Sequence, residues 1–364
     1  MGNKVPVDES YGKIEINLEK LTFTAGEQVN GWVLVSLVKP FLADTLYLII
    51  SGKERTKFVK SRQVHTDHGT HTVYDHYKGK NEFYEYLIPL YKHQSGFFPV
   101  GQYSFPFSFK LVQDLPGSFD MDYTSHGYPC YGKIKYKIKA GFKDPALKKT
   151  FFKKASFFLN QVWQSPSTEK TTHYEKHLKG YCYVNLGAYR IQAHFDKDKF
   201  FAGDNCSIAV EIDNTDAKRD AKNVKCQLVQ NTRLQIQNSS VVDYVRNVLS
   251  EEILPGIPKG ESRKGSEAFK IQLPIRTQNQ LQASSSGVLV KNEFQLVIST
   301  ELDACLCCRN HPHTEADIKI YNMPIELVPR YPVNNWNPQM IPLYVCPMGP
   351  DMKLTPEMKA QLYQ

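Results

Sequence analysis

The sequence predicts an all-β protein made of two tandem β-sandwich domains, bilobed in shape and followed by a short extended C-terminal tail. Apolar and polar residues alternate with period two nearly everywhere, helical periodicity is scarce, and one strand opening occurs twice. The first copy reads Phe-Thr-Ala-Gly-Glu at 23–27 and the second reads Phe-Ala-Gly-Asp at 201–204. Gly26 and Gly203 lie 203 − 26 = 177 residues apart, far more than a solenoid repeat of about 20–50 residues. The repeat therefore indicates a β-rich domain that occurs twice.

The alternation predicts the strands of the first domain in order. They cover 13–18, 28–35, 46–50, 104–110 and 133–140. In each of them one set of side chains is expected to face a core and the other to face water. At Gly26 and Gly203 the Ala-Gly-acid turn predicts a positive φ, which glycine adopts most readily.

A histidine-rich stretch separates a strand expected to end near Val59 from one expected to begin near Phe83. Its imidazoles are His65, His68, His71 and His76. Imidazole suits metal binding and pH sensing. The Thr, Asp and Gly residues between them predict a solvated hairpin, which we take as the simpler interpretation.

Further strands are expected over 205–212, 224–229, 288–299 and 318–327. The alternation breaks near 161–181, and from Tyr331 onward the chain is rich in Pro, Asn and Met. The predicted organisation is an N-terminal segment 1–10, a first sandwich 11–165, an inter-domain connection 166–180, a second sandwich 181–330 and a Pro-rich extended tail 331–364.

Composition narrows the class of protein. The 364 residues are 41% hydrophobic and 12% aromatic, enough for two packed cores. No apolar run approaches 18 residues and no N-terminal signal region is evident, so we expect a cytoplasmic protein whose eight cysteines are reduced. The net charge of +8 favours anionic headgroups, phosphorylated tails or acidic partners. Nucleic acid is not an expected partner, because the lysines are spread along strands and no nucleic-acid-binding motif is present.

Two adjacent segments carry a resemblance to a known family. They read Phe-Pro-Val-Gly-Gln-Tyr-Ser-Phe-Pro-Phe-Ser-Phe-Lys-Leu at 98–111 and Asp-Leu-Pro-Gly-Ser-Phe at 114–119. With Ala-Gly-Glu at 25–27, Gly-Lys-Ile-Lys-Tyr at 132–136 and, more weakly, Ala-Gly-Asp at 202–204, they resemble arrestin-fold proteins of the α-arrestin, or arrestin-domain-containing, type. The similarity covers roughly residues 11–328.

The resemblance implies two arrestin-type, immunoglobulin-like sandwiches that meet at a concave polar interface, with no catalytic site and no cofactor. It also implies an adaptor that binds cytosolic segments of membrane proteins and recruits trafficking or ubiquitination machinery. Many α-arrestins carry Pro-Pro-x-Tyr motifs for a ubiquitin ligase, but this chain has none. Its nearest tail sequence is Ile-Pro-Leu-Tyr at 341–344, so Pro342 and Tyr344 are the candidate partner motif.

The densest chemical cluster is the Cys/His segment near the end of the second domain. It contains Cys305, Cys307, Cys308, His311 and His313. Thiolate and imidazole are zinc ligands, although their spacing here is poor for one tetrahedral site. The resemblance places the segment in a loop between the last two strands, on an edge that contacts bilayers in arrestins. Cys305, Leu306, Cys307 and Cys308 are therefore candidates for a membrane or S-acylation edge, and an ordinary loop of reduced thiols is the third interpretation.

No serine-hydrolase elbow, phosphate loop, zinc-protease motif or dinucleotide fingerprint occurs, so we predict no enzymatic activity. The predicted function is that of a non-enzymatic cytoplasmic adaptor or scaffold in intracellular protein trafficking and endocytosis. Peripheral contact with the plasma or endosomal membrane is part of that expectation. The alternative is a structural subunit of a stable assembly, such as a retromer-like coat or a cytoskeletal complex.

Overall fold

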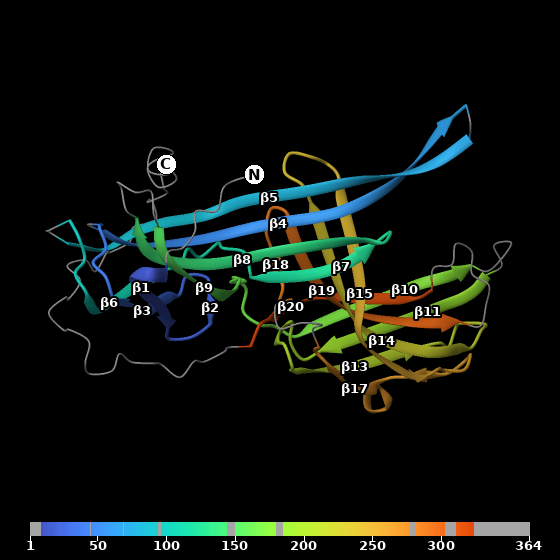
Figure 1. The fold of residues 1–364 in the computed structure, drawn as a ribbon. Helices are drawn as coiled ribbons and strands as arrows, with labels where there is room; N and C mark the ends of the chain where they lie inside the picture. The colour runs from blue at the N-terminus through green and yellow to red at the C-terminus, as the bar shows by residue number, and fades with distance from the viewer. Residues whose placement is uncertain are drawn as a thin grey trace.

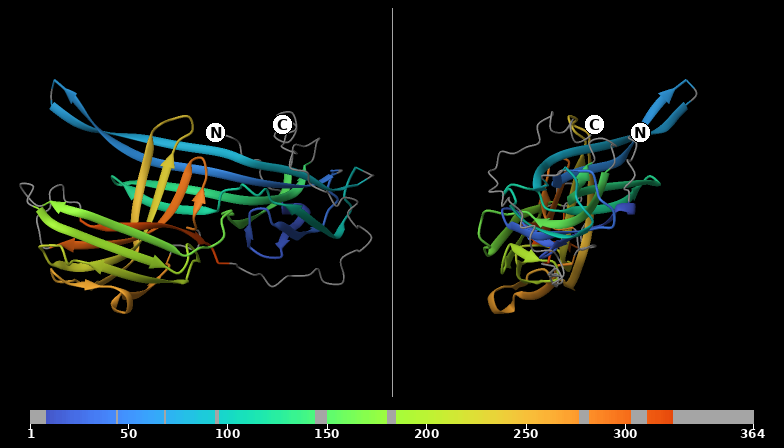
Figure 2. Two further views of the ribbon diagram at one scale, coloured as in Figure 1. Left: turned by 180° about the vertical axis from the view of Figure 1, so that it is seen from behind. Right: turned by 60° about the vertical axis from the view of Figure 1, so that its left-hand side comes forward.

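The computed structural model describes residues 9–43, 45–67, 69–93, 96–143, 150–179, 185–276, 282–302 and 311–323. Within these residues the regular secondary structure is β-strand apart from two short 3-10 turns, Glu9–Tyr11 and Gly265–Glu267. The strands form two β-sandwiches, one after the other along an elongated molecule (Figures 1 and 2). The predicted all-β fold of two tandem sandwiches is therefore confirmed, while the predicted tail lies outside the described residues.

The first sandwich packs a three-stranded sheet against a six-stranded one. The smaller sheet has the order β1 (Gly12–Leu18), β3 (Gln28–Leu37) and β6 (Gly101–Lys110). The larger has the order β2 (Thr22–Thr24), β9 (Thr150–Asn160), β8 (Tyr128–Lys143), β4 (Thr45–Thr66) and β5 (Gly69–Lys92), with β7 (Phe119–Ser125) paired to β8. Phe105, Phe107 and Phe109 of β6 all face the core, as their period-two spacing predicts, and Pro106 lies in an edge strand.

The second sandwich repeats the two-layer plan. One sheet contains β10 (Lys170–Lys179), β11 (Asn185–Phe195), β13 (Asn205–Asp213) and β16 (Ser262–Arg263), with β17 (Phe269–Pro274) paired to β13. The other has the order β12 (Lys199–Phe201), β20 (His313–Tyr321), β19 (Val290–Leu302), β14 (Ala221–Gln235) and β15 (Val242–Pro255), with β18 (Ser285–Ser286) on β19. No helix among the described residues has the length and hydropathy needed to cross a membrane.

The repeated strand opening folds the same way in both domains. Gly26 and Gly203 both have positive φ, 83° and 99°, as the turn sequence predicts. In the first copy the amide of Thr24 donates to the Glu27 carboxylate at 2.9 Å, and in the second the amide of Phe201 donates to Asp204 at 3.0 Å. Each short strand before the turn, β2 or β12, pairs in parallel with a late strand of its own domain. The repeat in the sequence is thus a repeat of one hydrogen-bonded turn.

The histidine-rich hairpin is much longer than the sequence predicts. Strands β4 and β5 run for 22 and 24 residues and stay paired out to Thr66 and Gly69, forming an arm that projects from the body (Figure 1). The predicted strand ends near Val59 and Phe83 are therefore wrong. Beyond the sandwich both faces of the arm are in contact with solvent, so neither face needs apolar side chains. The sequence therefore does not alternate there, although the backbone hydrogen bonds between the two strands continue. His65, His71 and His76 are exposed on this arm, and His68 lies outside the described residues.

Candidate functional site

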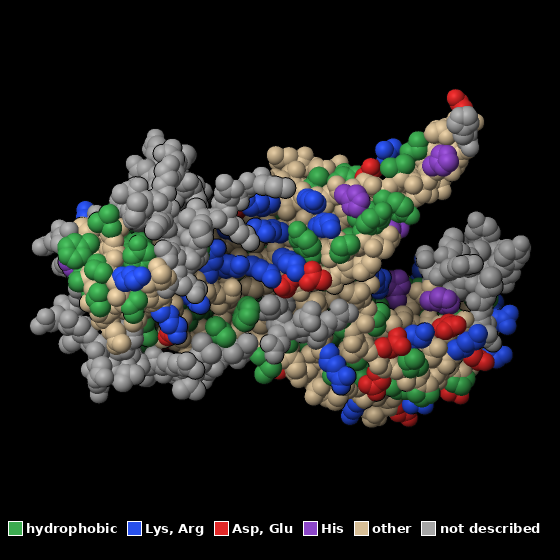
Figure 3. All heavy atoms as spheres, viewed as in Figure 1, with side chains coloured by type: hydrophobic (Ala, Val, Ile, Leu, Met, Phe, Trp, Pro, Cys, Tyr) green, Lys and Arg blue, Asp and Glu red, His purple; other side chains and the backbone are tan. Residues whose placement is uncertain are grey.

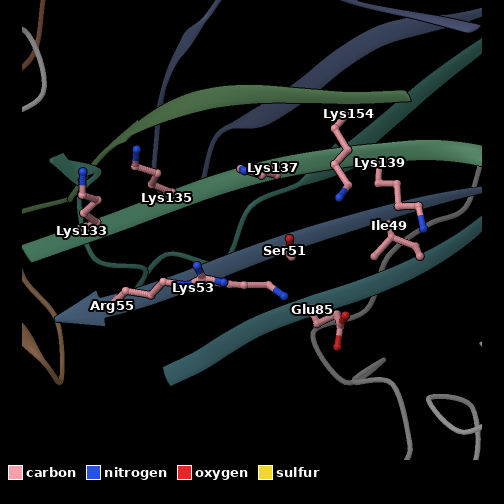
Figure 4. A pocket seen from close by; sticks show the side chains of 10 residues that line it. All are labelled: Ile49, Ser51, Lys53, Arg55, Glu85, Lys133, Lys135, Lys137, Lys139 and Lys154. Carbon is pink, nitrogen blue, oxygen red and sulfur yellow. The ribbon is translucent and has the colours of Figure 1, made fainter. Parts of the chain in front are cut away.

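A groove of about 490 Å³ lies on the outer face of the six-stranded sheet in the first domain (Figure 4). We call it the basic groove, because seven of its ten lining side chains are Lys or Arg: Lys53, Arg55, Lys133, Lys135, Lys137, Lys139 and Lys154, together with Ile49, Ser51 and Glu85. In the space-filling view, Lys and Arg side chains gather in a band along the middle of this domain (Figure 3). Strands β4, β5, β8 and β9 all contribute to the groove.

Strand alternation and sheet register build this surface together. On β8, Ile134, Tyr136 and Ile138 are buried in the core, so the lysines between them project from the opposite face. The antiparallel register places Lys133 opposite Arg55, Lys135 opposite Lys53, Lys137 opposite Ser51, and Lys139 between Ile49 and Lys154. The alternate lysines of β8 thereby lie beside cations of the neighbouring strands β4 and β9, and together they form one positively charged surface.

Carboxylates pair with several of the cations in one part of the groove. Asp120 accepts from Lys133 at 2.9 Å and from Lys135 at 2.6 Å. Glu82 accepts from Lys53 at 2.9 Å, and its hydrogen bonds to Lys53 and Lys80 lower the pKa of Glu82 to about 2. At the end of the groove nearer the second domain, Lys53, Lys133 and Lys135 are therefore held in ion pairs.

The other part of the groove keeps its positive charge. None of the described carboxylates forms an ion pair with Lys137, Lys139 or Lys154. Burial, together with the nearby positive charge of Lys154, lowers the pKa of both Lys137 and Lys139. The Nζ atoms of Lys139 and Lys154 lie 4.1 and 5.1 Å from the centre of the Phe152 ring. Crowded ammonium groups on an aromatic ring favour a bound anion, which would relieve their mutual repulsion.

The lysine row of β8 runs along the middle of that strand. From Lys133 to Lys139 it covers six residues, or roughly 20 Å of extended strand. Beside its start, Gly132 is so close to the second domain that an added Cβ would lie 2.5 Å from Leu234 Cδ2. Beyond its end, the Phe142 ring lies 4.6 Å from Phe98 at the far end of the first domain. A ligand in the groove would thus extend outward from the junction between the domains.

That junction encloses an acidic side chain, Glu54, which forms no ion pair with any described Lys or Arg. Glu54 of β4 is fully buried. Its Oε2 accepts hydrogen bonds from Asn81 Nδ2 at 3.0 Å and from the backbone amide of Leu289, in the second domain, at 3.2 Å. Its Oε1 has no hydrogen-bond partner among the described residues. Burial raises the pKa of Glu54, and the hydrogen bonds only partly oppose the rise.

Glu54→Gln should therefore change how stability depends on pH. The unfolded chain releases the Glu54 proton near pH 4.5, but the folded chain retains it to higher pH, so this group's contribution to stability is lost as pH rises from 4.5 through the raised pKa. Each pKa unit of the rise corresponds to about 1.4 kcal/mol. We expect the unfolding free energy of Glu54→Gln, relative to the wild type, to increase as the pH of urea titrations is raised above 4.5. A difference that stays constant with pH would contradict the assignment.

The sequence-predicted site residues are only partly described. Cys305, Leu306, Cys307, Cys308, Pro342 and Tyr344 lie outside the described residues. His313 begins β20, and its Nδ1 donates to the carbonyl oxygen of His311 at 3.1 Å. The described part of the chain contains no group of three or more His, Cys, Asp or Glu side chains that could hold a metal. The metal and acylation hypotheses for this segment stay predictions.

The basic groove itself was not predicted. The sequence carries a signal for it, since Lys occupies four alternate positions from 133 to 139, more than a solvated strand face requires. The cations of β4 and β9 could not be added to that row without knowing the sheet register.

Comparison with known proteins places this fold in a family. Residues 12–162 match the model of the arrestin (or S-antigen) N-terminal domain, and residues 186–325 match the model of the arrestin (or S-antigen) C-terminal domain. Arrestin domain-containing protein A of Dictyostelium discoideum is 24% identical over 304 residues, covering 82% of this chain and 51% of the relative. Arrestin domain-containing protein 17 of Caenorhabditis elegans is 22% identical over 261 residues, covering 70% of this chain and 58% of the relative.

A third relative, the lateral eye arrestin of Limulus polyphemus, is 24% identical over 207 residues, covering 55% of this chain and 50% of the relative. The chain therefore spans about half the length of the curated relatives it matches. The two family models follow one another in the order of the two sandwiches and together cover most of the described strands. On this ground the chain belongs to the arrestin family, with arrestin-domain-containing proteins among its relatives.

Proposed function

We propose that this protein is a non-enzymatic adaptor whose basic groove binds acidic or phosphorylated cytosolic segments of membrane proteins during intracellular trafficking, including endocytosis. The observation that carries the proposal is the cluster of Lys137, Lys139 and Lys154, which forms no ion pair with any described carboxylate. Sorting or ubiquitination machinery would be a second class of partner, recruited through other surfaces. The place of action would be the cytoplasm and the cytoplasmic face of the plasma or endosomal membrane.

The geometry of the groove favours an extended ligand. Alternate residues of a β-strand lie about 7 Å apart, so successive lysines on β8 repeat at that distance. A peptide in extended conformation presents its own alternate side chains at the same interval. Phosphates or carboxylates at every second position would therefore each meet a lysine, and the ammonium groups would supply charge-assisted hydrogen bonds.

Fluorescence anisotropy with the full chain tests this proposal. The probe is an eight-residue labelled peptide with phosphoserine at alternate positions, measured in about 0.15 M salt, where nonspecific attraction between exposed charges is screened beyond about 8 Å. The triple variant Lys137→Gln, Lys139→Gln and Lys154→Gln should bind at least about 100-fold more weakly, since each charge-assisted hydrogen bond contributes about 1.5–3 kcal/mol.

The matched control changes three exposed lysines of the second domain, Lys218, Lys259 and Lys270, to Gln. It removes the same net charge and should bind within about threefold of the wild type, because distant exposed charges are screened. The groove variant should also unfold no earlier than the wild type, since it removes like-charge crowding. Equal weakening in both variants would show attraction by net charge alone and would overturn the groove assignment.

One surface of the second domain favours the alternative function, a structural subunit of a stable assembly. Strand β15 lies at the edge of its sheet and carries three exposed apolar side chains. The exposed fractions of Tyr244, Val248 and Ile253 are 69%, 50% and 58%. An edge strand with exposed apolar side chains is suited to pairing with another chain. Size-exclusion chromatography of native extract separates the two functions: a subunit elutes only in a large complex, whereas an adaptor elutes mostly near 41.7 kDa.

A further inference from the structure

The end of the first domain farthest from the second domain exposes four large apolar side chains on two neighbouring loops. Val38 and Leu42 lie between β3 and β4 and are 64% and 51% exposed, and Phe97 and Val100 lie between β5 and β6 and are 40% and 57% exposed. We call these four residues the apolar tip. In Figure 3, hydrophobic side chains gather at the left-hand end of the molecule, where the labels of Figure 1 place β6.

The backbone holds the two loops together. Phe41 and Phe98 form an isolated antiparallel bridge, with both amides donating to the partner carbonyl at 2.9 Å. Both rings are buried, at 1% and 0% exposure, so each anchors its loop in the core. Leu42 directly follows Phe41 and Phe97 directly precedes Phe98, and their side chains are 51% and 40% exposed. The tip therefore consists of exposed apolar side chains on two loops that are anchored at one backbone bridge.

The charge around the tip selects the kind of partner. Lys39 is exposed between the apolar residues of its loop, and the acidic residue of that loop, Asp44, lies outside the described residues. The β8 lysine row approaches the same end, because the ring of Phe142, three residues after Lys139, packs against Phe98 with the ring centres 4.6 Å apart. Aromatic and aliphatic side chains flanked by lysines suit the boundary between headgroups and acyl chains of an anionic bilayer.

Size and shape argue against a protein partner here. A stable protein interface needs about 800 Å² on each side, with complementary surfaces. Four exposed side chains on two loops offer less apolar area than such an interface needs. A small apolar surface can still insert into the fluid interface of a bilayer, which adapts to its shape. We propose that the apolar tip inserts into the interfacial region of anionic membranes and so attaches the first domain to the bilayer.

Vesicle co-sedimentation of the full chain tests this inference without any peptide ligand. The vesicles are phosphatidylcholine alone or phosphatidylcholine with about one third phosphatidylserine, enough to give the surface a negative potential. Leu42→Ser with Phe97→Ser should weaken binding to the anionic vesicles at least about tenfold, the factor that loss of one large buried apolar side chain produces. Lys39→Gln should weaken only binding to anionic vesicles, and only in low salt.

The matched control is Tyr244→Ser with Ile253→Ser, which removes an equally exposed apolar pair from β15 and should leave sedimentation unchanged. Phe97→Trp adds a direct readout, since its emission should shift to the blue and become quenched by brominated lipid tails when vesicles are added. Binding that survives Leu42→Ser with Phe97→Ser, equal losses in the control, or no response from Phe97→Trp would each overturn the proposal. So would a change in sedimentation coefficient of the tip variant without vesicles, which would make the tip a contact between copies of the chain.

Groove binding and tip insertion can fail separately. The lysine variant of the groove keeps the apolar tip, and the tip variant keeps the groove. Loss of vesicle binding in the tip variant together with unchanged peptide affinity is the expected pair of results.

Discussion

Phe98→Ala should destabilise the first domain by about 3–5 kcal/mol. Phe98 has no exposed surface, and its ring centre lies 4.6 Å from Phe142, 5.7 Å from Tyr91 and 6.2 Å from Tyr103. Truncation would leave a cavity among rings that are fixed by both sheets, so the site cannot close by a small movement. Urea unfolding followed by tryptophan fluorescence measures the loss.

The neighbouring residue supplies the control. Phe97→Ala removes the same number of atoms from a side chain that is 40% exposed, and its expected effect on unfolding free energy is within about 0.5 kcal/mol. Similar losses in the two variants would contradict the burial of Phe98 and with it the anchoring of the loop that bears Phe97.

Gly287→Ala should destabilise the junction between the domains by about 1–3 kcal/mol through overpacking. A Cβ at this position would overlap Oε1 of Glu54 and lie 2.9 Å from its carboxyl carbon. Glu54 cannot retreat without losing its hydrogen bonds to Asn81 and to the amide of Leu289. Those bonds hold the loop before β19 against the first domain, so the clash would also loosen the contact between domains.

A double-mutant cycle tests the physical cause. If the cost of Gly287→Ala comes from Glu54, then Gly287→Ala combined with Glu54→Ala should cost less than the sum of the single changes. Thermal unfolding of the four proteins gives the coupling. Strictly additive costs would show that another neighbour, such as the carbonyl of Val290, limits the space around Gly287.

The duplicated turn shows which structural features a short stretch of sequence can predict. Gly26 and Gly203 were predicted to take positive φ from three-residue patterns, because only the backbone of the turn itself decides that angle. The faces of β8 follow equally well from period-two alternation, since its lysines and its apolar residues cannot share a side of the sheet.

The arm of β4 and β5 shows where local pattern fails. Its outer half has no core on either side, so nothing in the sequence requires apolar alternation, and the strands were predicted to stop near Val59 and resume near Phe83. Backbone hydrogen bonding between the two strands continues regardless of side-chain type, out to Thr66 and Gly69.

The sequence by itself determined the all-β class, the doubled domain, the face on which each β8 side chain lies and the resemblance to arrestins. Each of these depends on residues close together in the chain or on a motif that is read directly. Only the tertiary structure decided that Lys53 and Lys154 join the β8 lysines, that Glu54 is enclosed by the loop around Leu289, and that the loops of the apolar tip meet at the bridge between Phe41 and Phe98. Those pairs are set by sheet register and domain packing, which depend on the fit of whole surfaces far apart in sequence.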